Sequence, residues 1–471
     1  MNYDESVRAL LWLGRELSAP RQPAASSAPG ARVQKFGLEN ITTLSAALRN
    51  PHRAVPCVHI AGTNGKGSTA AMLESILRAA GLRTGLYTSP HLQRINERIR
   101  IGGQNIADED FAAAWTRVHA AIESLLASGA LAAHPTYFEC LTAMAFLAFA
   151  EHKLDLAVYE VGLGGRLDST NIVAPEVAVI TSIGFDHENF LGHSIEEIAG
   201  EKAGIIKPGA TVVSSAERPE ARAVIARRCA EMNARLIEVD SPWRLEDVQF
   251  RDGLYRATAI SSPWQTAIAL APALAGRFQL RNALAAATAA RLLAERGFAV
   301  GDAAIARGIS TVRWPGRLER ISERPLVYLD GAHNTAGAGE LLKFWDDNFA
   351  GRRIWLVYGA LRDKAVDEIA GLLFPRAETV ILTEPLQPRA ISAPLLAEMT
   401  GHHATNLIVE RDPGEALERA LEMAAPDDAI FATGSLYLVA DLHHHWAARG
   451  PEGAWAAAAA PARPQGVSRL P

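Results

Sequence analysis

The chain has 471 residues, of which 49% are apolar and 21% are charged, and its formal net charge is −5 at pH 7. This length exceeds what one ordinary hydrophobic core holds and predicts two or three globular domains. The acidic balance disfavours a general nucleic-acid-binding protein, which is usually basic, although it leaves room for a local cationic pocket. Cys57, Cys140 and Cys229 form no C-x-x-C pair and are typical of reduced, buried cysteines in a cytosolic protein.

The first segment, residues 1–17, mixes charges with apolar residues at helical spacing, which predicts an amphipathic helix and not a signal peptide. The most apolar helix candidate, residues 141–150, is shorter than the roughly 20 residues that span a bilayer. We therefore expect a soluble, cytoplasmic protein without a membrane partner.

In chain order, a loop rich in Pro, Ala and Ser (18–30) follows the first helix and leads to a second helix (36–48). A strand (55–61), a helix (70–80) and a short strand (82–88) form a βαβ unit, which implies a parallel sheet. Two helices follow, one from Asp108 and one over 136–153. Continuous apolar strands at 156–161 and 177–183 are typical of a buried parallel sheet.

Further along, the pattern predicts a helix at 195–206, a hairpin at 244–259 and an alanine-rich helix at 280–297. Residues 311–325, which include two prolines and a glycine, are the candidate linker. Beyond it, strands at 326–329, 354–358, 380–383 and 429–432 alternate with helices, as in a small Rossmann-like domain. The tail, 450–471, is predicted to be disordered.

The stretch GTNGKGST, residues 62–69, joins a strand to a helix and is typical of a phosphate-binding loop. Lys66 would reach the terminal phosphates, and Ser68 or Thr69 could hold Mg²⁺. The stretch departs from G-x-x-x-x-G-K-[ST], because Ile60 holds the first glycine position and Gly67 follows the lysine. The alternative is a plain glycine turn.

Three polar residues, Ser89, Glu160 and His187, lie at the ends of predicted strands of the same sheet. Ligands bind beyond the carboxyl ends of such strands, so these residues could hold Mg²⁺ beside the phosphates. The alternative for each is a satisfied polar residue at a strand end. Residues 162–171 form a second glycine-rich loop, which is either a tight turn or a close approach to a ligand, with Arg166 or Asp168 in contact.

Other patterns are less specific. The helical pair Glu201-Lys202 is typical of a solvated surface pair. In DGAHN, residues 330–334, Asn334 could cap the next helix. The adjacent histidines at 443–445 would point in different directions on a helix, which favours a solvated helix end over a metal site.

As a set, the motifs resemble those of the dihydrofolate synthase/folylpolyglutamate synthase family, within the Mur-ligase superfamily. They occur in family order as GTNGKGST (62–69), LYTSPHL (86–92) with ERI (97–99), TYFE (136–139), VGLGGRLDSTN (161–171), TSIGFDH (181–187), EKAGI (201–205), PGR (315–317), DGAHN (330–334) and GSLYL (434–438). Thr335 is a departure, since the family often has Pro there.

The resemblance implies an α/β fold with a P-loop Mur-ligase-type N-terminal domain (1–314), which carries a pteroate pocket, and a Rossmann-like C-terminal domain (315–449) that closes over ATP. It implies a monomeric, ADP-forming ligase that joins L-glutamate to dihydropteroate, to folates, or to both through an acyl phosphate. Two Mg²⁺ ions and an N-carboxylated Lys202 would assist.

The family's roles carry over to residues that match its motifs. ATP would be contacted by Thr63, Asn64, Gly65, Lys66, Gly67, Ser68, Asn282, Arg317 and Asp330. One Mg²⁺ would be held by Ser89 and Glu160, and a second by His187. The pteroate pocket would be lined by Thr136, Tyr137, Phe138, Glu139, Leu167, Asp168 and Ser169. The residues with catalytic roles would be Lys66, Lys202 and His333, the last near the glutamate end.

Two alternatives stay open at this point. Another Mur-type ligase could act on a cell-wall precursor, although the pteroate segments and TSPHL disfavour it. A nucleotide-binding regulator without ligase chemistry would share the phosphate loop.

Overall fold

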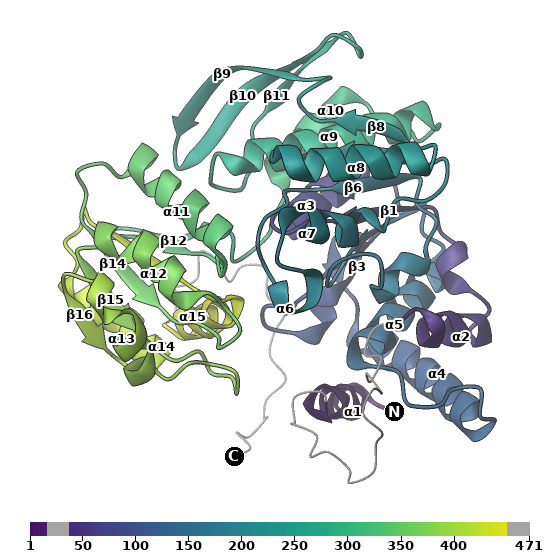
Figure 1. Ribbon diagram of the computed structural model, residues 1–471, viewed down its shortest axis with the longest axis horizontal. Helices are drawn as coiled ribbons and strands as arrows, with labels where there is room; N and C mark the ends of the chain where they lie inside the picture. Colours follow the sequence, from purple (N-terminus) through teal and green to yellow (C-terminus); the bar gives the residue numbers. More distant parts are fainter. Residues whose placement is uncertain (17–36, 450–471) are drawn as a thin grey trace. The chain divides into compact units, whose positions relative to one another are not determined.

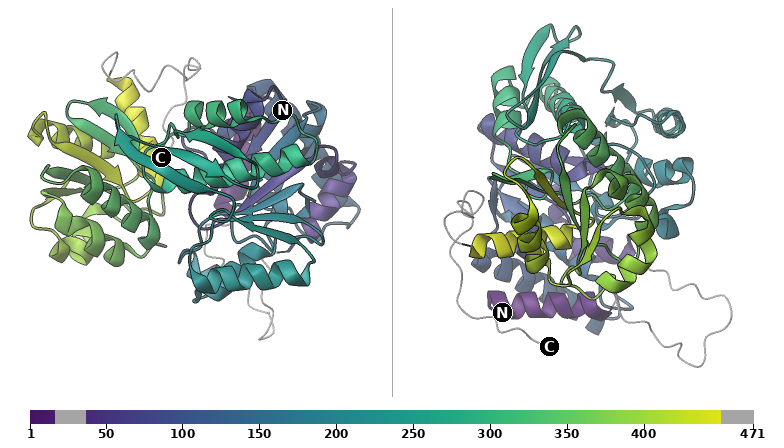
Figure 2. Two further views of the ribbon diagram at one scale, coloured as in Figure 1. Left: turned by 90° about the horizontal axis from the view of Figure 1, so that it is seen from above. Right: turned by 90° about the vertical axis from the view of Figure 1, so that its left-hand side faces the viewer.

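The computed structural model describes residues 1–16 and 37–449, which divide into two compact units, one covering Met1–Trp314 and one that begins at Pro315. Each unit has a largely parallel sheet with helices packed on it (Figures 1 and 2). The predicted loop at 18–30 and the predicted tail at 450–471 lie outside the described residues.

The first unit contains most of the chain. Its helices are α1 (Tyr3–Glu16), α2 (Glu39–Ala47), α3 (Lys66–Ala79), α4 (Asp108–Ala127), α5 (Tyr137–Glu151), α6 (Glu188–Leu191), α7 (Ile195–Ala203), α8 (Pro219–Glu231), α9 (Phe278–Glu295) and α10 (Asp302–Thr311). Its strands are β1 (Cys57–Ala61), β2 (Thr84–Tyr87), β3 (Ile99–Ile101), β4 (Gln104–Asn105), β5 (Leu156–Glu160), β6 (Val177–Ile180), β7 (Thr211–Ser214), β8 (Arg235–Glu238), β9 (Arg244–Arg251), β10 (Leu254–Ser261) and β11 (Thr266–Leu270).

The main sheet has the strand order β4-β3-β2-β5-β1-β6-β7-β8. In this order, the neighbouring strands β2, β5, β1, β6, β7 and β8 pair in parallel. At the other end of the sheet, β3 pairs antiparallel with both β2 and β4. All five residues of β1 are buried, as expected for a strand that is paired on both sides. Because parallel strands end at the same edge, the residues after β1, β2, β5 and β6 converge there.

Helices cover both faces of this sheet. Tyr87 and Tyr159 belong to a core that they share with α4 and α5, and Ala178 and Ile180 belong to a second core with α7 and α8. Side chains alternate along a strand, so the intervening residues face the other side. On this other face of the sheet, α3 packs on β1, β2 and β5, and also against α9 and α10.

Two predicted elements of this unit differ from the structure. The helix predicted at 70–80 begins four residues earlier, at Lys66, because Gly65 adopts φ +85° and serves as its N-cap. Lys66 and Ser68 therefore lie in the first helical turn. The predicted hairpin at 244–259 is part of a three-stranded antiparallel sheet, since β11 pairs with β10.

The second unit contains helices α11 (Thr335–Asn348), α12 (Val366–Leu373), α13 (Ala393–Thr400), α14 (Pro413–Met423) and α15 (Leu436–Ala448). Its strands are β12 (Glu319–Glu323), β13 (Leu326–Leu329), β14 (Ile354–Tyr358), β15 (Thr379–Leu382), β16 (Leu407–Val409) and β17 (Ala429–Thr433). The sheet order is β12-β13-β17-β14-β15-β16, and every pairing is parallel except that of β12 with β13.

The prediction of a linker at 311–325 is wrong in part, because this range contains strand β12. Ile321 points inward and is 2% exposed, so β12 packs against the core of the second unit despite its polar neighbours. Within the described residues, all three cysteines are buried with free thiols. None of the helices in 1–16 and 37–449 has the length and hydropathy needed to cross a membrane.

Candidate functional site

The turn after β1 lies close to its neighbours and leaves no room for side chains at two glycines. Gly62 and Gly65 have φ values of +150° and +85°. A Cβ atom at Gly62 would lie 1.8 Å from Thr181 Oγ1, and one at Gly65 would lie 2.4 Å from Asn282 Oδ1. The glycines therefore let the backbone approach β6 and α9, as a phosphate-binding loop requires.

Hydrogen bonds to the segment after β6 hold this loop in shape. The Thr63 hydroxyl donates to Gly184 O at 3.0 Å, and the carbonyl oxygen of Asn64 accepts from Thr181 Oγ1 at 2.8 Å and from Ser182 Oγ at 3.1 Å. Thr63 and Asn64, both predicted to contact phosphate, thus also fix the loop through these bonds.

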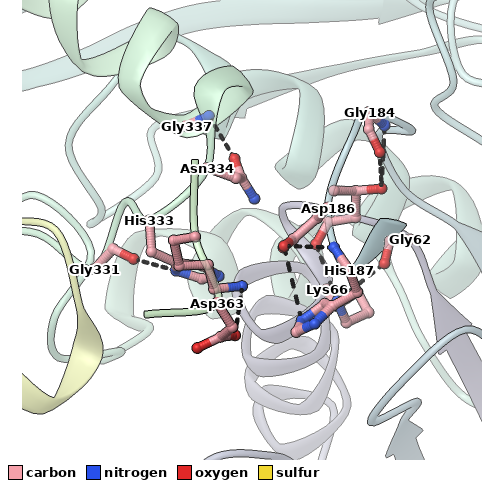
Figure 3. A network of polar contacts seen from close by, with 12 residues as sticks. Gly62, Lys66, Gly184, Asp186, His187, Gly331, His333, Asn334, Gly337 and Asp363 are labelled. Atoms are coloured by element: carbon pink, nitrogen blue, oxygen red, sulfur yellow. Dashed lines mark hydrogen bonds and ion pairs between the residues drawn. The ribbon is translucent and has the colours of Figure 1, made fainter. Parts of the chain in front are cut away.

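Lys66 folds back over the loop. Its Nζ donates to Gly62 O at 2.9 Å and to Thr63 O at 3.0 Å, and Figure 3 shows the lysine beside Gly62. Its ammonium group is therefore held next to the backbone that would cradle the phosphates.

Helix α9 supplies two amides behind the loop. Ser68 is 3% exposed and accepts from Gln279 Nε2 at 3.4 Å, while Asn282 Nδ2 donates to Gln279 Oε1 at 2.9 Å. Asn282 was predicted at the site, and Gln279 was not. Nothing in the local sequence distinguishes a buried helical glutamine from a solvated one.

Lys202 is not the solvated surface residue that its helical context predicts. It is 4% exposed, and its Nζ donates to Gly62 O at 2.9 Å, the same carbonyl oxygen that accepts from Lys66. Burial, followed by the positive charge of Lys66, lowers the pKa of Lys202 to about 7. Glu201, its sequence neighbour, instead pairs with Arg166 at 2.8 Å near the surface.

The predicted metal ligands lie at the carboxyl edge of the sheet. Glu160 ends β5, is 4% exposed, and accepts a hydrogen bond from the backbone N–H of Ser89 at 3.2 Å. His187 has a left-handed backbone, φ +52°, and its Nε2 lies 3.8 Å from Asp186 Oδ1. A buried carboxylate, a serine hydroxyl and an imidazole form a donor set that fits Mg²⁺, with the oxygens the better ligands.

In the TYFE segment, two of the predicted pocket residues cap α5. Glu139 N donates to Thr136 Oγ1 at 3.2 Å, and Thr136 N donates to Glu139 Oε2 at 2.7 Å, which is a capping box. The Tyr137 ring lies under the Arg98 guanidinium at 5.4 Å. A Cβ atom at Gly162 would lie 2.4 Å from the Phe138 ring, so this segment contacts the second glycine-rich loop.

Asp168 organises that second loop from inside. Its carboxylate accepts from the backbone N–H groups of Gly162 and Leu163, both at 3.0 Å, and from the Thr170 hydroxyl at 2.5 Å. Burial raises the pKa of Asp168, and these hydrogen bonds oppose the rise.

The loop is tied to its surroundings by two further contacts. His59 Nε2 lies 2.8 Å from Thr170 Oγ1, which links the centre of β1 to this network. Ser169 Oγ lies 2.7 Å from Thr142 Oγ1, and Leu167 is partly exposed. His59 was not predicted, because a histidine inside an apolar strand carries no motif.

The other predicted residues belong to the second unit. Asp330 follows β13, and its carboxylate accepts from Leu318 N at 2.8 Å and Ala332 N at 2.9 Å. Burial raises the pKa of Asp330. Arg317 donates to Gly316 O at 3.0 Å, and His333 Nδ1 lies 2.7 Å from Gly331 O (Figure 3).

Two lesser predictions of this unit have different outcomes. Asn334 accepts from Gly337 N at 2.8 Å and so caps α11, as predicted. The solvated helix end at 443–445 is wrong for His443, which is 9% exposed and lies 2.6 Å from Glu319 Oε2. The histidines do point apart, since His445 contacts Glu418 at 2.7 Å.

The sequence matches two families of Mur ligase domains, the Mur ligase middle domain over residues 60–290 and the Mur ligase glutamate ligase domain over residues 316–436. It is 38% identical over 419 residues to dihydrofolate synthase/folylpolyglutamate synthase of Bacillus subtilis, covering 87% of this chain and 94% of that protein. It is 36% identical over 410 residues to folylpolyglutamate synthase of Lacticaseibacillus casei, covering 86% and 94%.

Solved structures resemble the fold over nearly the whole chain. Folylpolyglutamate synthase of Mycobacterium tuberculosis, complexed with ADP and AMPPCP, has a TM-score of 0.82 at 31% identity and covers 93% of this chain and 98% of its own. FolC of Escherichia coli, in complex with DHPP and ADP, has a TM-score of 0.78 at 31% identity with the same coverage. The chain therefore belongs to the dihydrofolate synthase/folylpolyglutamate synthase family and is an ATP-dependent ligase of the Mur type.

Proposed function

We propose that this protein joins L-glutamate to dihydropteroate, to a folate, or to both, with ATP converted to ADP and phosphate. The observation that carries the proposal is the convergence of Lys66 and Lys202 on one carbonyl oxygen, that of Gly62, at the end of β1. The names of similar proteins, and the ADP and DHPP bound by a structural relative, support the substrates.

The phosphate loop binds ATP through its backbone and side chains. The proposed phosphate and nucleotide contacts are Thr63, Asn64, Gly65, Lys66, Gly67, Ser68, Asn282, Arg317 and Asp330. The first turn of α3, which begins at Lys66, would direct backbone N–H groups at the phosphates, and the Lys66 ammonium would neutralise charge on the transferring phosphoryl group.

Ser89, Glu160 and His187 would hold two Mg²⁺ ions, which neutralise phosphate charge and align the substrate carboxylate when bound. Lys202 completes this site as a carbamate. The ammonium group first loses one proton; the neutral amine then attacks CO₂, forms an N–C bond and releases a second proton, so a cation becomes a metal-binding anion. The pKa of about 7 supports this step, because half of the amine is neutral near that pH.

The chemistry follows from this arrangement. The substrate carboxylate attacks the γ-phosphorus of ATP, giving an acyl phosphate and ADP. The glutamate amine then attacks the acyl carbon, and the tetrahedral intermediate loses phosphate to leave an amide. The segments Thr136–Glu139 and Leu167–Ser169 would orient the pteroate part, and His333 would contact the glutamate end.

Coupled ADP release tests the proposal, with dihydropteroate and tetrahydrofolate assayed side by side, each with and without L-glutamate. We expect release that requires glutamate and at least one of the two acceptors. Release that is the same without acceptor and glutamate would indicate a regulator instead. Release only with a UDP-linked muropeptide would indicate a cell-wall ligase.

A further inference from the structure

Outside the candidate ATP site, three side chains of the types that bind metals lie close together on and beside α4. His119 and Glu123 lie one turn apart on this helix, and His134 lies in the segment between α4 and α5. Each can offer one ligand atom, and the three atoms lie within 4.8 Å of one another. His134 and His119 are half-buried and Glu123 is exposed, so the cluster is open to solvent on one side.

The His134 ring is oriented by a hydrogen bond of its own. Its Nδ1 lies 2.7 Å from the carbonyl oxygen of Pro135. A carbonyl only accepts, so Nδ1 carries the proton and Nε2 keeps its lone pair in the neutral ring. This is the arrangement in which protein histidines bind metals, since the outer hydrogen bond sets the tautomer and the ring orientation.

His119 is also held in place, by a ring contact. Its ring stacks on Trp115, with centroids 5.3 Å apart and planes at 23°. Its Nδ1 is buried, and the described part of the chain offers that nitrogen no hydrogen-bond partner. Coordination through Nδ1 would supply the missing partner.

The backbone that carries the three residues is anchored on both sides. Trp115, Val118 and Ile122 bury the inner face of α4, which leaves His119 and Glu123 beside that face. In the connecting segment, Leu131 is 5% exposed and donates its N–H to Leu125 O at 3.2 Å. Pro135 is buried as well, so His134 lies between two fixed points.

We propose that His119, Glu123 and His134 bind one Zn²⁺ or a similar borderline divalent cation. Two imidazoles and one carboxylate suit Zn²⁺ far better than Mg²⁺, and a water molecule completes a tetrahedral set. The bound ion joins α4 to the segment before α5 and so fixes the Thr136 cap. The binding does not depend on the proposed ligase function, because none of the three residues belongs to the ATP, metal or pteroate sets.

The test uses the full-length chain stripped of metal, with Co²⁺ as a spectroscopic probe and Zn²⁺ as a competitor. A second cluster among the described residues, Asp367, His402 and His403, could also take the ion. All titrations therefore use a His402→Ala/His403→Ala parent and excess Mg²⁺ to occupy the candidate catalytic site. We expect one Co²⁺ per chain, with the visible absorption of a four-coordinate site, that Zn²⁺ displaces.

Glu123→Gln and His134→Ala should each weaken binding by roughly 100-fold or more, because the first replaces an anionic ligand by a neutral amide and the second removes an imidazole. His152→Ala is the matched control, since His152 follows the end of α5 and also reaches α4, where it lies 3.4 Å from Asp110. The control should leave the affinity unchanged. Zn²⁺ should raise the melting temperature of the parent but not of Glu123→Gln, whose exposed side chain is not needed for folding.

Two results would overturn the proposal. The first is that the His402→Ala/His403→Ala parent lacks the visible absorption of four-coordinate Co²⁺, or that Zn²⁺ does not raise its melting temperature. The other is binding that persists unchanged in both Glu123→Gln and His134→Ala, which would assign the ion to other residues.

Discussion

At the scale of single residues, burial is the main cause of the lowered pKa of Lys202. A solvated lysine is charged at neutral pH, but Lys202 lies inside the first unit beside a second lysine, which lowers its pKa to about 7. Its helical Glu-Lys context predicts a surface pair, and the amphipathic pattern of a nine-residue helix does not reveal which charged residue points inward. The family resemblance alone identified this lysine in advance.

Lys202→Ala should reduce turnover by roughly 100-fold or more, because it removes the carbamate that would hold Mg²⁺ beside the developing phosphoryl charge. Lys207→Met is the matched control, since Lys207 is a partly buried lysine of the same unit and donates to Asn171 O at 2.7 Å and not to the phosphate loop. Steady-state ADP release measures both. Near-normal turnover in Lys202→Ala, with or without added bicarbonate, would remove the carbamate from the mechanism.

Carboxylation of Lys202 should depend on pH in a defined direction. Below about pH 7 the amine is protonated and cannot attack CO₂, and above it the neutral form predominates. With ¹³C-bicarbonate, the carbamate NMR signal should therefore grow between about pH 6 and 8 and be absent from Lys202→Ala. A signal that is flat across this range, or one that survives the substitution, contradicts the assignment.

His59 should stabilise the second glycine-rich loop. The Thr170 hydroxyl uses its one O–H to donate a hydrogen bond to Asp168. In the contact between His59 Nε2 and Thr170 Oγ1, the histidine nitrogen must therefore be the donor. Burial, with a smaller effect from Lys207, lowers the pKa of His59 to about 3, which keeps the ring neutral. His59→Leu should cost about 1–3 kcal/mol because the buried hydroxyl loses its donor, and His59→Gln should cost less. Urea midpoints measure this, and an unchanged midpoint in His59→Leu would contradict it.

At the scale of elements, regular apolar runs were predictable, whereas elements that depend on a special backbone or on one inward-facing residue were not. The strand predicted at 354–358 is observed as β14, and those at 55–61 and 156–161 differ from β1 and β5 by at most two residues at an end. The start of α3 was missed because it depends on the left-handed backbone of Gly65, which a run of small residues hides. Strand β12 was missed because its polar residues surround a single inward-facing side chain, that of Ile321.

Gly65→Ala tests the turn that starts α3. A side chain at φ +85° is strained by roughly 1–2 kcal/mol, and its Cβ would also displace Asn282. Gly81→Ala is the control, because Gly81 has φ +88° at the end of the same helix and nothing within 4 Å. Calorimetry should show weakened ADP binding for Gly65→Ala only. Equal losses in both variants would mean that backbone strain alone matters.

Glu160, the last residue of β5, should determine the Mg²⁺ concentration that the activity requires. Glu160→Gln keeps the shape of the side chain but removes its charge, so the Mg²⁺ concentration for half-maximal activity should rise at least about tenfold. Asp155→Asn is the control, since Asp155 precedes the same strand and pairs with Arg83 at the opposite edge. An Mg²⁺ titration that is unchanged in Glu160→Gln would remove this carboxylate from the metal site.

At the scale of the whole molecule, topology explains why distant motifs act together. Residues 62–69, Ser89, Glu160 and the segment after β6 come from four places in the sequence, and the parallel order β2-β5-β1-β6 brings them to one edge. Pairing order is a non-local property that no single motif encodes. The resemblance therefore proposes the residues of the candidate site, whereas their supporting contacts, such as those of Gln279 and His59, required the structure.

The most direct test of the proposed ligase reaction follows the oxygen of the substrate. Dihydropteroate or tetrahydrofolate labelled with ¹⁸O in its carboxylate is incubated with ATP, Mg²⁺ and L-glutamate, and both products are analysed by mass spectrometry. An acyl phosphate transfers one carboxylate oxygen to phosphate, so each amide formed should yield one ¹⁸O-labelled phosphate. Unlabelled phosphate, or phosphate release without a glutamate-containing product, would contradict the account.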